Sequence, residues 1–178
     1  MDNTDKENWY ALFVATGQEE RVKKILETNL QNETDNHLKF VIPVRELRER
    51  KAGKWKMVKR KLFPGYILVK GNIDVETYYI LKKESGIAKL LRDEEEPLKI
   101  QEDELRVLKI LTRDKEGYIG ISNAFKENDK IKITDGPLAG LEGLIESVNA
   151  RKGRAKVRLN FLGEKRLVEL GINFVDKI

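Results

Sequence analysis

The segment RKLFPGYILV, residues 60–69, joins a basic stretch to an apolar one and decides how the first half of the chain is interpreted. Its last part, 66–69, is apolar without alternation, which is typical of a strand that is covered on both faces. A second such run at 9–15 predicts another strand of this kind. The polar stretch 47–60 predicts a hairpin that turns near Ala52-Gly53. We therefore expect a basic hairpin that leads directly into a central strand of a sheet.

Apolar residues at helical spacing complete the first half. The run from Val22 to Leu30 predicts an amphipathic helix, and Glu19 and Glu20 stand at its N-terminal end, where the helix dipole favours acidic side chains. Asp74 is suited to cap a short helix, and Glu102 opens a third. Shorter strands are predicted at 38–42 and 87–91. The order strand, helix, strand, hairpin, strand, helix, strand, helix is an α+β pattern.

The second half of the chain follows a different pattern. From 113 to 126 the periodicity lapses into polar residues and two glycines, which is typical of a linker. Short alternating runs separated by turns then predict a small barrel of five strands. These runs are 131–133, 141–150, 154–161, 164–170 and 172–178. The sequence thus predicts one domain at 1–112, a linker at 113–126 and a second domain at 127–178.

The composition excludes several classes of site. The chain of 178 residues has no cysteine, so disulfides, thiolate metal sites and a cysteine nucleophile are excluded, and its one histidine, His37, cannot form a histidine metal cluster. With no phosphate-binding glycine loop and no carboxylate pair within apolar sequence, we predict no catalytic residue, cofactor or metal. No apolar run approaches the roughly 18 residues of a membrane span, so a soluble, cytoplasmic monomer is expected.

Positive charge is concentrated in two regions of the chain. Overall, 35 Lys and Arg stand against 30 Asp and Glu, but 45–61 alone has nine basic and two acidic residues, a local charge of +7. Lys54, Lys56 and Lys59 surround Trp55 in this hairpin, and such a segment can bind a nucleic-acid backbone and stack on a base. The alternative is a solvated hairpin whose lysines discourage edge pairing.

The second basic region is a strand of the predicted barrel. Ala155, Val157, Leu159 and Phe161 share one face because strand side chains alternate, which places Arg154, Lys156 and Arg158 on the other face. Arg151 and Lys152 extend this face around the Gly153 turn, and Lys165 and Arg166 extend it from the next strand. The layout predicts a phosphate-binding surface, and its alternative is the ordinary polar outside of a barrel.

Several segments, in this order, resemble the NusG family of transcription elongation factors, and the resemblance covers nearly the whole chain. In the first half it rests on Trp9-Tyr10, on VIPV at 41–44 and on RKLFPGYILV at 60–69. In the second half it rests on IKITDGPLAG at 131–140 with Gly143, on FLG at 161–163 and on VEL at 168–170. The segment 131–140 alone would also suggest a ribosomal RNA-binding protein.

The resemblance implies an N-terminal NGN domain, a four-stranded antiparallel sheet with flanking helices, followed by an SH3-like KOW barrel. It implies that the first domain binds the clamp helices of the largest subunit of RNA polymerase and favours processive elongation, without chemistry of its own. The implied contact is Phe63, with Trp9, Tyr10, Pro64 and Tyr66 beside it. For Trp9 and Tyr66 the alternative is a place in the core.

The barrel departs from the housekeeping members of this family. The stretch 149–158 is far more basic than their usual turn, and EKRL at 164–167 replaces their Arg-x-Thr-Pro. Housekeeping barrels bind termination factor Rho or a small-subunit ribosomal protein near the position of Phe161. The chain is more similar to the LoaP group of antiterminators, which implies binding of a nascent RNA hairpin by the barrel. We also expect the basic hairpin, 45–61, to approach upstream or non-template DNA in the elongation complex. The alternating pattern does not favour a fold-switching paralog of the RfaH kind.

Overall fold

The structure is a computed structural model that describes residues 8–33, 37–83, 87–89, 91–93, 96–97, 99–113 and 117–175, and for 87–97 it describes the backbone path alone. The chain divides into two compact units. The first, called here the sheet unit, contains Met1–Ile42 and Phe63–Gln101, and the second, the barrel unit, contains Pro43–Leu62 and Glu102–Ile178. The basic hairpin and the third helix therefore belong to the same compact unit as the barrel.

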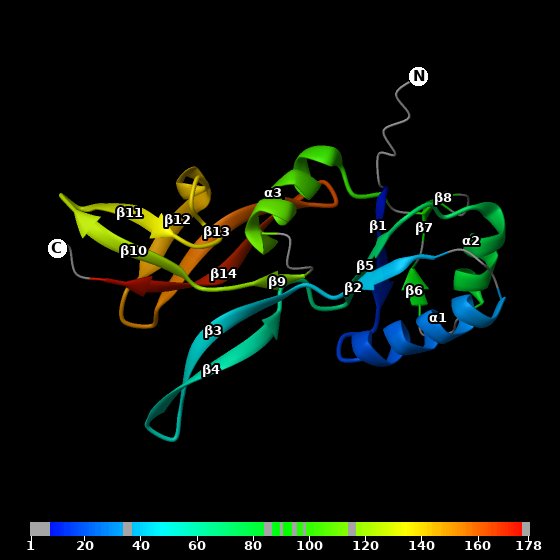
Figure 1. Ribbon diagram of the computed structural model, residues 1–178, viewed down its shortest axis with the longest axis horizontal. Coiled ribbons are helices and arrows are strands. Elements are labelled where there is room, and N and C mark those ends of the chain that lie inside the picture. The colour runs from blue at the N-terminus through cyan, green and yellow to red at the C-terminus, as the bar shows by residue number, and fades with distance from the viewer. Residues whose placement is uncertain are drawn as a thin grey trace. The chain divides into compact units, whose positions relative to one another are not determined.

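Four antiparallel strands form the main sheet of the sheet unit, in the order β2-β5-β1-β6 (Figure 1). They are β1 (Trp9–Val14), β2 (Lys39–Val41), β5 (Tyr66–Lys70) and β6 (Ile87–Lys89). The helices of this unit are α1 (Glu19–Glu33) and α2 (Val75–Lys82), and the short strands β7 (Leu91–Asp93) and β8 (Glu96–Pro97) pair with each other. The predicted four-stranded antiparallel sheet with helices is confirmed.

Both faces of this sheet bury apolar side chains. On the helix side, Leu12 of β1 and Ile67 of β5 pack with Leu26 of α1 in one core. On the other side, Ala11 and Leu68 are also buried. Because side chains alternate along each strand, burial of neighbouring positions means that both faces are covered. The unalternating apolar runs predicted this correctly.

Acidic side chains fix both helix N-termini of the sheet unit. Asp74 caps α2 as predicted, since its carboxylate accepts a hydrogen bond from the Thr77 N–H at 2.7 Å, and hydrogen bonding to Thr77 lowers the pKa of Asp74. Glu19 is fully buried instead. Its Oε1 accepts from the Gly65 N–H at 2.8 Å, and its Oε2 accepts from the Gly17 N–H at 2.9 Å. Glu19 thereby joins the start of α1 to the loop that precedes β5.

The barrel unit begins with the basic hairpin. Its strands β3 (Val44–Lys51) and β4 (Lys54–Lys61) pair along their whole length. They are joined by Ala52 and Gly53, whose φ values are 52° and 77°, as a two-residue turn between twisted strands requires. The strand β9 (Tyr118–Ile119) lies parallel to β3, so the sheet order is β4-β3-β9. The predicted hairpin and its turn are confirmed.

Five strands form the second sheet of the barrel unit, in the order β11-β10-β14-β13-β12. They are β10 (Ser122–Glu127), β11 (Lys130–Asp135), β12 (Ile145–Asn149), β13 (Arg154–Phe161) and β14 (Glu164–Phe174), with a short 3₁₀ helix, η1 (Glu142–Leu144), before β12. The predicted number of strands is correct, but two of the segments that form them were predicted wrongly. The runs 164–170 and 172–178 belong to the single strand β14 as far as Phe174, with 176–178 outside the described residues, and β10 was not predicted.

The stretch predicted as a linker, 113–126, contains β9 and most of β10, while 114–116 lie outside the described residues. The inward side chains of β10 include Ser122 and Ala124, which are buried but small, so they produce no apolar pattern. The helix α3 (Glu102–Thr112) precedes this stretch, and its buried Glu104 accepts a hydrogen bond from the Gly163 N–H at 3.0 Å. The domain limits at 112 and 127 stay a prediction.

Candidate partner-binding surfaces

An aromatic pair marks one end of the sheet face that is turned away from the helices. Phe13 of β1 and Tyr66 of β5 are register partners, and their rings meet edge to face with centroids 5.3 Å apart. The Phe13 side chain is 41% exposed although it lies in a central strand, and Tyr66 is half-buried. Pro64, in the loop before β5, is exposed as well. We call Phe13, Pro64 and Tyr66 the aromatic patch.

The other three residues predicted to contact a partner lie elsewhere. Phe63 is only 2% exposed, and Trp9, at 9%, is buried on the same sheet face as Tyr66. Tyr10 is on the opposite face and packs against the core on the helix side. A role for these three stays a prediction. Phe13 was missed, although alternation along the strand places it on the face of Trp9.

Strand β13 alternates as predicted. Its inward residues are all buried, and these are Ala155, Val157, Leu159 and Phe161. Arg154, Lys156 and Arg158 occupy the outward positions, but acidic side chains of neighbouring strands meet two of them. The Arg158 Nη1 is 3.2 Å from Glu146 of β12, and the Arg154 Nη1 is 2.7 Å from Glu169 of β14. The outward face is therefore less positive than β13 alone predicts.

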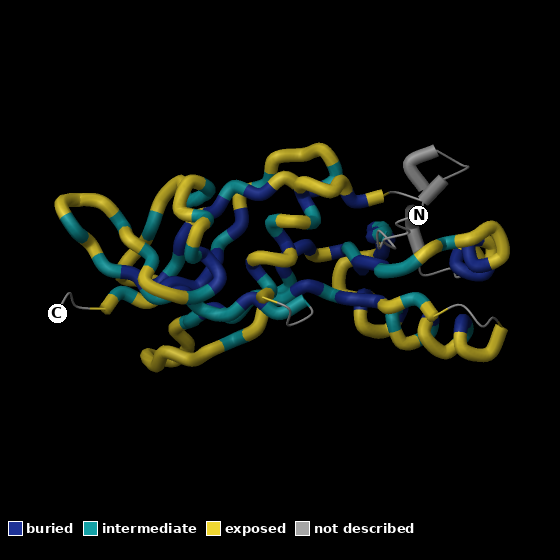
Figure 2. Tube along the Cα trace, turned by 45° about the horizontal axis from the view of Figure 1, so that its top comes forward, coloured by how far each residue is buried: buried dark blue, intermediate teal, exposed yellow. Residues whose placement is uncertain are grey.

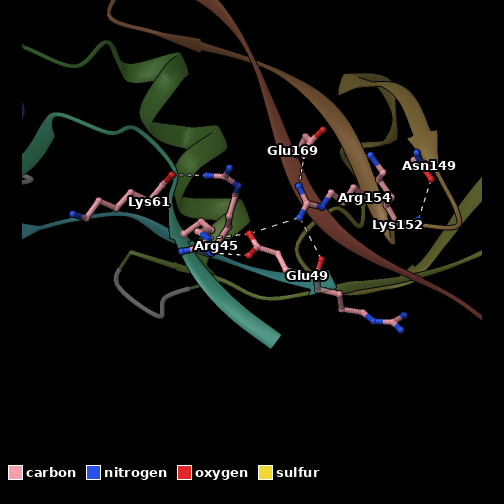
Figure 3. A network of polar contacts seen from close by, with 9 residues as sticks. Arg45, Glu49, Lys61, Asn149, Lys152, Arg154 and Glu169 are labelled. Atoms are coloured by element: carbon pink, nitrogen blue, oxygen red, sulfur yellow. Dashed lines mark hydrogen bonds and ion pairs between the residues drawn. The ribbon is translucent and has the colours of Figure 1, made fainter. Parts of the chain in front are cut away.

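Arg154 is the centre of a polar network between the barrel and the hairpin (Figure 3). Its Nη2 lies 3.8 Å from the Glu49 Oε1 and donates a hydrogen bond of 3.3 Å to the Arg48 carbonyl oxygen, both on β3. Glu49 is also paired at 2.6 Å with Arg60, whose hydrogen bond lowers the pKa of that carboxyl. With 23% of its side chain exposed, Arg154 joins barrel and hairpin rather than presenting its charge to solvent.

Three cations remain exposed around the turn between β12 and β13. Arg151 and Lys152 lie in this turn, where the Lys152 backbone N–H donates a 3.0 Å hydrogen bond to the Asn149 side chain. Lys156 follows on β13 and is exposed too. Within the described part of the chain, none of the three cations forms an ion pair. We call Arg151, Lys152 and Lys156 the turn cations.

Two cations of β14 were predicted to extend the basic face of β13, but in the structure they lie on opposite faces of the sheet. Lys165 is exposed and lies opposite Asn160 in the register, on the outward face with Lys156. Arg166 is on the inward side, with its Cζ 5.3 Å from the centre of the Phe161 ring. Phe161 itself is fully buried, so its ring exposes no surface to the protein partner that was predicted to bind there.

The hairpin lysines are exposed, as the yellow colour of the hairpin's end shows in Figure 2. Lys54 and Lys56 share one face of β4, whereas Lys59 is on the other face with Trp55. The Lys59 Nζ lies 5.2 Å from the centre of the Tyr118 ring. Trp55 is 40% exposed, which is unusual for so large an apolar side chain. Of the three predicted lysines, the structure thus places only Lys59 on the face of the Trp55 ring.

No group of three His, Asp or Glu side chains in the described ranges is placed to hold a metal ion. No helix among those residues is long and apolar enough to cross a membrane.

Comparisons with known proteins agree in naming one family. The family model described as "Transcription termination factor nusG" matches residues 7–109. The "Transcription termination/antitermination protein NusG" of Bacillus subtilis is 32% identical over 97% of this chain and 99% of its own length. The protein of the same name from Halalkalibacterium halodurans is 31% identical with the same coverage, and that of Thermus thermophilus is 29% identical.

A solved structure described as "Domain interaction in Thermotoga maritima NusG" has the same fold. Its TM-score is 0.61, its sequence identity is 24%, and the match covers 94% of each chain. The likeness therefore extends over both halves of the molecule, including the α+β first half and the β-rich second half. With a family model over 7–109 and relatives above 30% identity along nearly the full length, the chain belongs to the NusG family.

Proposed function

We propose that this chain is a transcription elongation and antitermination factor that binds the clamp helices of RNA polymerase through the aromatic patch and binds RNA through the barrel unit. The names of its relatives support a role in transcription termination or antitermination. The observation that most supports the polymerase contact is the exposed Phe13–Tyr66 pair beside Pro64. Exposed aromatics on a rigid sheet are typical anchors of protein interfaces.

Replacing Phe13 and Tyr66 together by alanine should weaken binding to RNA polymerase about thirtyfold. An aromatic at the centre of an interface commonly contributes on the order of 2 kcal/mol, which corresponds to this factor. Both rings are at least partly exposed, so the variant should retain its fold better than one at the buried Phe63. The measurement is a titration of immobilised polymerase with the full chain.

Tyr79→Ala is the matched control, because Tyr79 is 57% exposed on α2 and outside the aromatic patch. It should bind polymerase like the parent. Equal binding of the double variant and the control, with unchanged thermal unfolding, would show that the patch is not the contact.

The exposed turn cations support the RNA-binding half of the proposal. Arg151, Lys152 and Lys156 lie in and just after one turn without ion-pair partners among the described residues, and phosphate groups are the natural ligands of such cations. The barrel face is small, and an RNA helix has a deep groove that side chains cannot read. We therefore expect recognition of a folded RNA by its shape and its phosphates.

Reversing two of these charges, with Lys152→Glu and Lys156→Glu, should weaken binding of a fluorescent RNA stem-loop by at least about tenfold. The loss should shrink as salt rises, because each phosphate contact releases counterions. Lys126→Glu with Lys130→Glu is the control, since both lysines are exposed on other strands of the barrel and the net charge changes equally. If both double variants lose affinity equally, the affinity for RNA depends only on net charge and not on this surface.

A further inference from the structure

The hairpin and the barrel turn meet at Arg48, and we propose that they form one RNA-binding surface in which Arg151 and Lys152 hold phosphates and Trp55 stacks on an unpaired base. This inference rests on the proposed function, because it specifies which RNA the barrel unit binds. The surface consists of Trp55, Arg48 and Arg50 from the hairpin with Arg151 and Lys152 from the turn.

The hairpin is held firmly against the barrel. At Gly171 of β14 the two backbones approach so closely that a Cβ would lie 2.6 Å from the Glu46 carbonyl oxygen of β3. Arg154 reaches across the same contact to Glu49 and to the Arg48 carbonyl oxygen. Arg45 lies here too, and burial lowers the pKa of its guanidinium, while Glu169 acts to raise it. The two parts therefore present their side chains in a defined arrangement.

Arg48 lies between the aromatic ring and the turn. Its Cζ is 5.1 Å from the centre of the Trp55 ring, in cation–π contact. Its Cδ would be 3.8 Å from a Cβ at Gly153, in the turn that contains Arg151 and Lys152. The Trp55 indole and the turn that contains Arg151 and Lys152 thus flank the Arg48 side chain, although the indole and the turn are about a hundred residues apart in sequence.

The two acidic residues of β3 both have partners. Glu46, on the face of Trp55, accepts a hydrogen bond from the Tyr118 hydroxyl. Glu49, on the other face, pairs with Arg60 and with Arg154. Arg50 is exposed and lies directly opposite Trp55 in the hairpin register, so it adds a cation on the side of the indole. The surface therefore combines an open ring with an excess of positive charge.

This combination fits a folded RNA that has an unpaired base beside a helix. Cations neutralise the phosphates of the helix, and they do so without regard to sequence. A bulged or loop base can leave the stack and lie on an indole, which adds a contact that a plain helix cannot make. Arg154 is then a positioning residue, since it fixes the hairpin beside the turn instead of touching a phosphate.

The experiment compares two RNA stems of about ten base pairs, one with a single bulged adenosine and one without, using the full chain at physiological salt. The parent should bind the bulged stem about tenfold more tightly, and Trp55→Ala should abolish this preference. Trp55→Phe should retain most of it, because a ring remains. In a Trp9→Phe background Trp55 is the sole tryptophan, and its fluorescence should be quenched by the bulged stem and not by the plain one.

Arg154→Ala separates positioning from phosphate contact. It should reduce the bulge preference while the dependence of affinity on salt stays as in the parent, whereas Arg151→Ala with Lys152→Ala should flatten that dependence. Trp55→Ala with an undiminished bulge preference, or equally tight binding of a bulged DNA stem, would overturn the inference. If the parent binds neither RNA, the RNA-binding half of the proposed function fails as well, which is a different result.

Discussion

Replacing Glu19 by alanine should lower the free energy of unfolding of the sheet unit by about 4 kcal/mol, because a hydrogen bond to a charged group contributes roughly 1.5–3 kcal/mol. The carboxylate is fully buried and accepts from the N–H groups of Gly17 and Gly65. Alanine leaves two N–H donors without this acceptor. Urea unfolding followed by Trp9 fluorescence, in a Trp55→Phe background, reports on this unit.

Two comparisons make this result specific. Glu27→Ala removes an exposed ion pair with Lys23 from the same helix, and it should cost less than about 0.5 kcal/mol. Glu19→Gln keeps one oxygen acceptor and should fall between the parent and Glu19→Ala. A Glu19→Ala variant as stable as Glu27→Ala would mean that the carboxylate does not join α1 to the loop at Gly65. Because that loop leads to the aromatic patch, polymerase binding should decline together with stability.

Gly136→Ala should destabilise the barrel unit by about 4 kcal/mol, through two separate effects. The backbone has a φ of 102°, which a residue with a Cβ adopts only under strain. The new Cβ would also lie 2.5 Å from the Ser122 Cα, and a backbone atom cannot move away as a flexible side chain can. The buried Ser122 accepts the Leu138 N–H at 2.9 Å through its Oγ, so displacing it breaks that hydrogen bond too.

Gly140→Ala isolates the first effect, the backbone strain. Gly140 has a φ of 83°, but a Cβ there would meet no atom within 4 Å. This variant should therefore lose only about 1–2 kcal/mol from backbone strain. The difference between the two variants in thermal unfolding measures the clash with Ser122. Equal losses of stability in the two variants would mean that position 136 requires glycine only for its backbone conformation.

The regular elements could be predicted because their patterns are local. The runs at 9–15 and 66–69 are apolar throughout, and both are central strands of the sheet. The alternation at 154–161 predicted which residues of β13 are buried. β10 was missed for the opposite reason, since its inward positions hold Ser122 and Ala124 rather than large apolar residues. The break at Gly171 reflects a close approach of β3 and not the end of a strand.

The functional surfaces were predicted less completely, because the side chains that neutralise or cover their residues come from other strands and loops. The stretch 149–158 around Arg154 and Arg158 contains no acidic residue, but in the structure Glu169 and Glu146 pair with these arginines from neighbouring strands. Glu19 has the pattern of an ordinary helix N-terminus, and its bond to Gly65 spans 46 residues. Side-chain partners across a sheet depend on the register of the strands, which the alternation within one strand does not specify.

The aromatic patch shows the same limit. Resemblance alone selected Phe63, which the structure buries at 2% exposure, and it passed over Phe13, which the structure exposes at 41%. Apolar character identifies both residues as candidates for a core. Only the position of Phe13 at the end of a strand leaves part of its ring uncovered.

The fraction of transcripts that read through an intrinsic terminator shows whether this chain binds elongating RNA polymerase and makes it more processive. Reactions would contain the cognate purified polymerase with the parent, with Phe13→Ala/Tyr66→Ala, or with the Tyr79→Ala control. We predict that the parent and the control raise readthrough on a template whose leader encodes a bulged RNA stem, and that the double variant does not. A parent protein that leaves readthrough unchanged on every template would mean that the chain is not such a factor, and a double variant as active as the parent would mean that the aromatic patch does not bind polymerase.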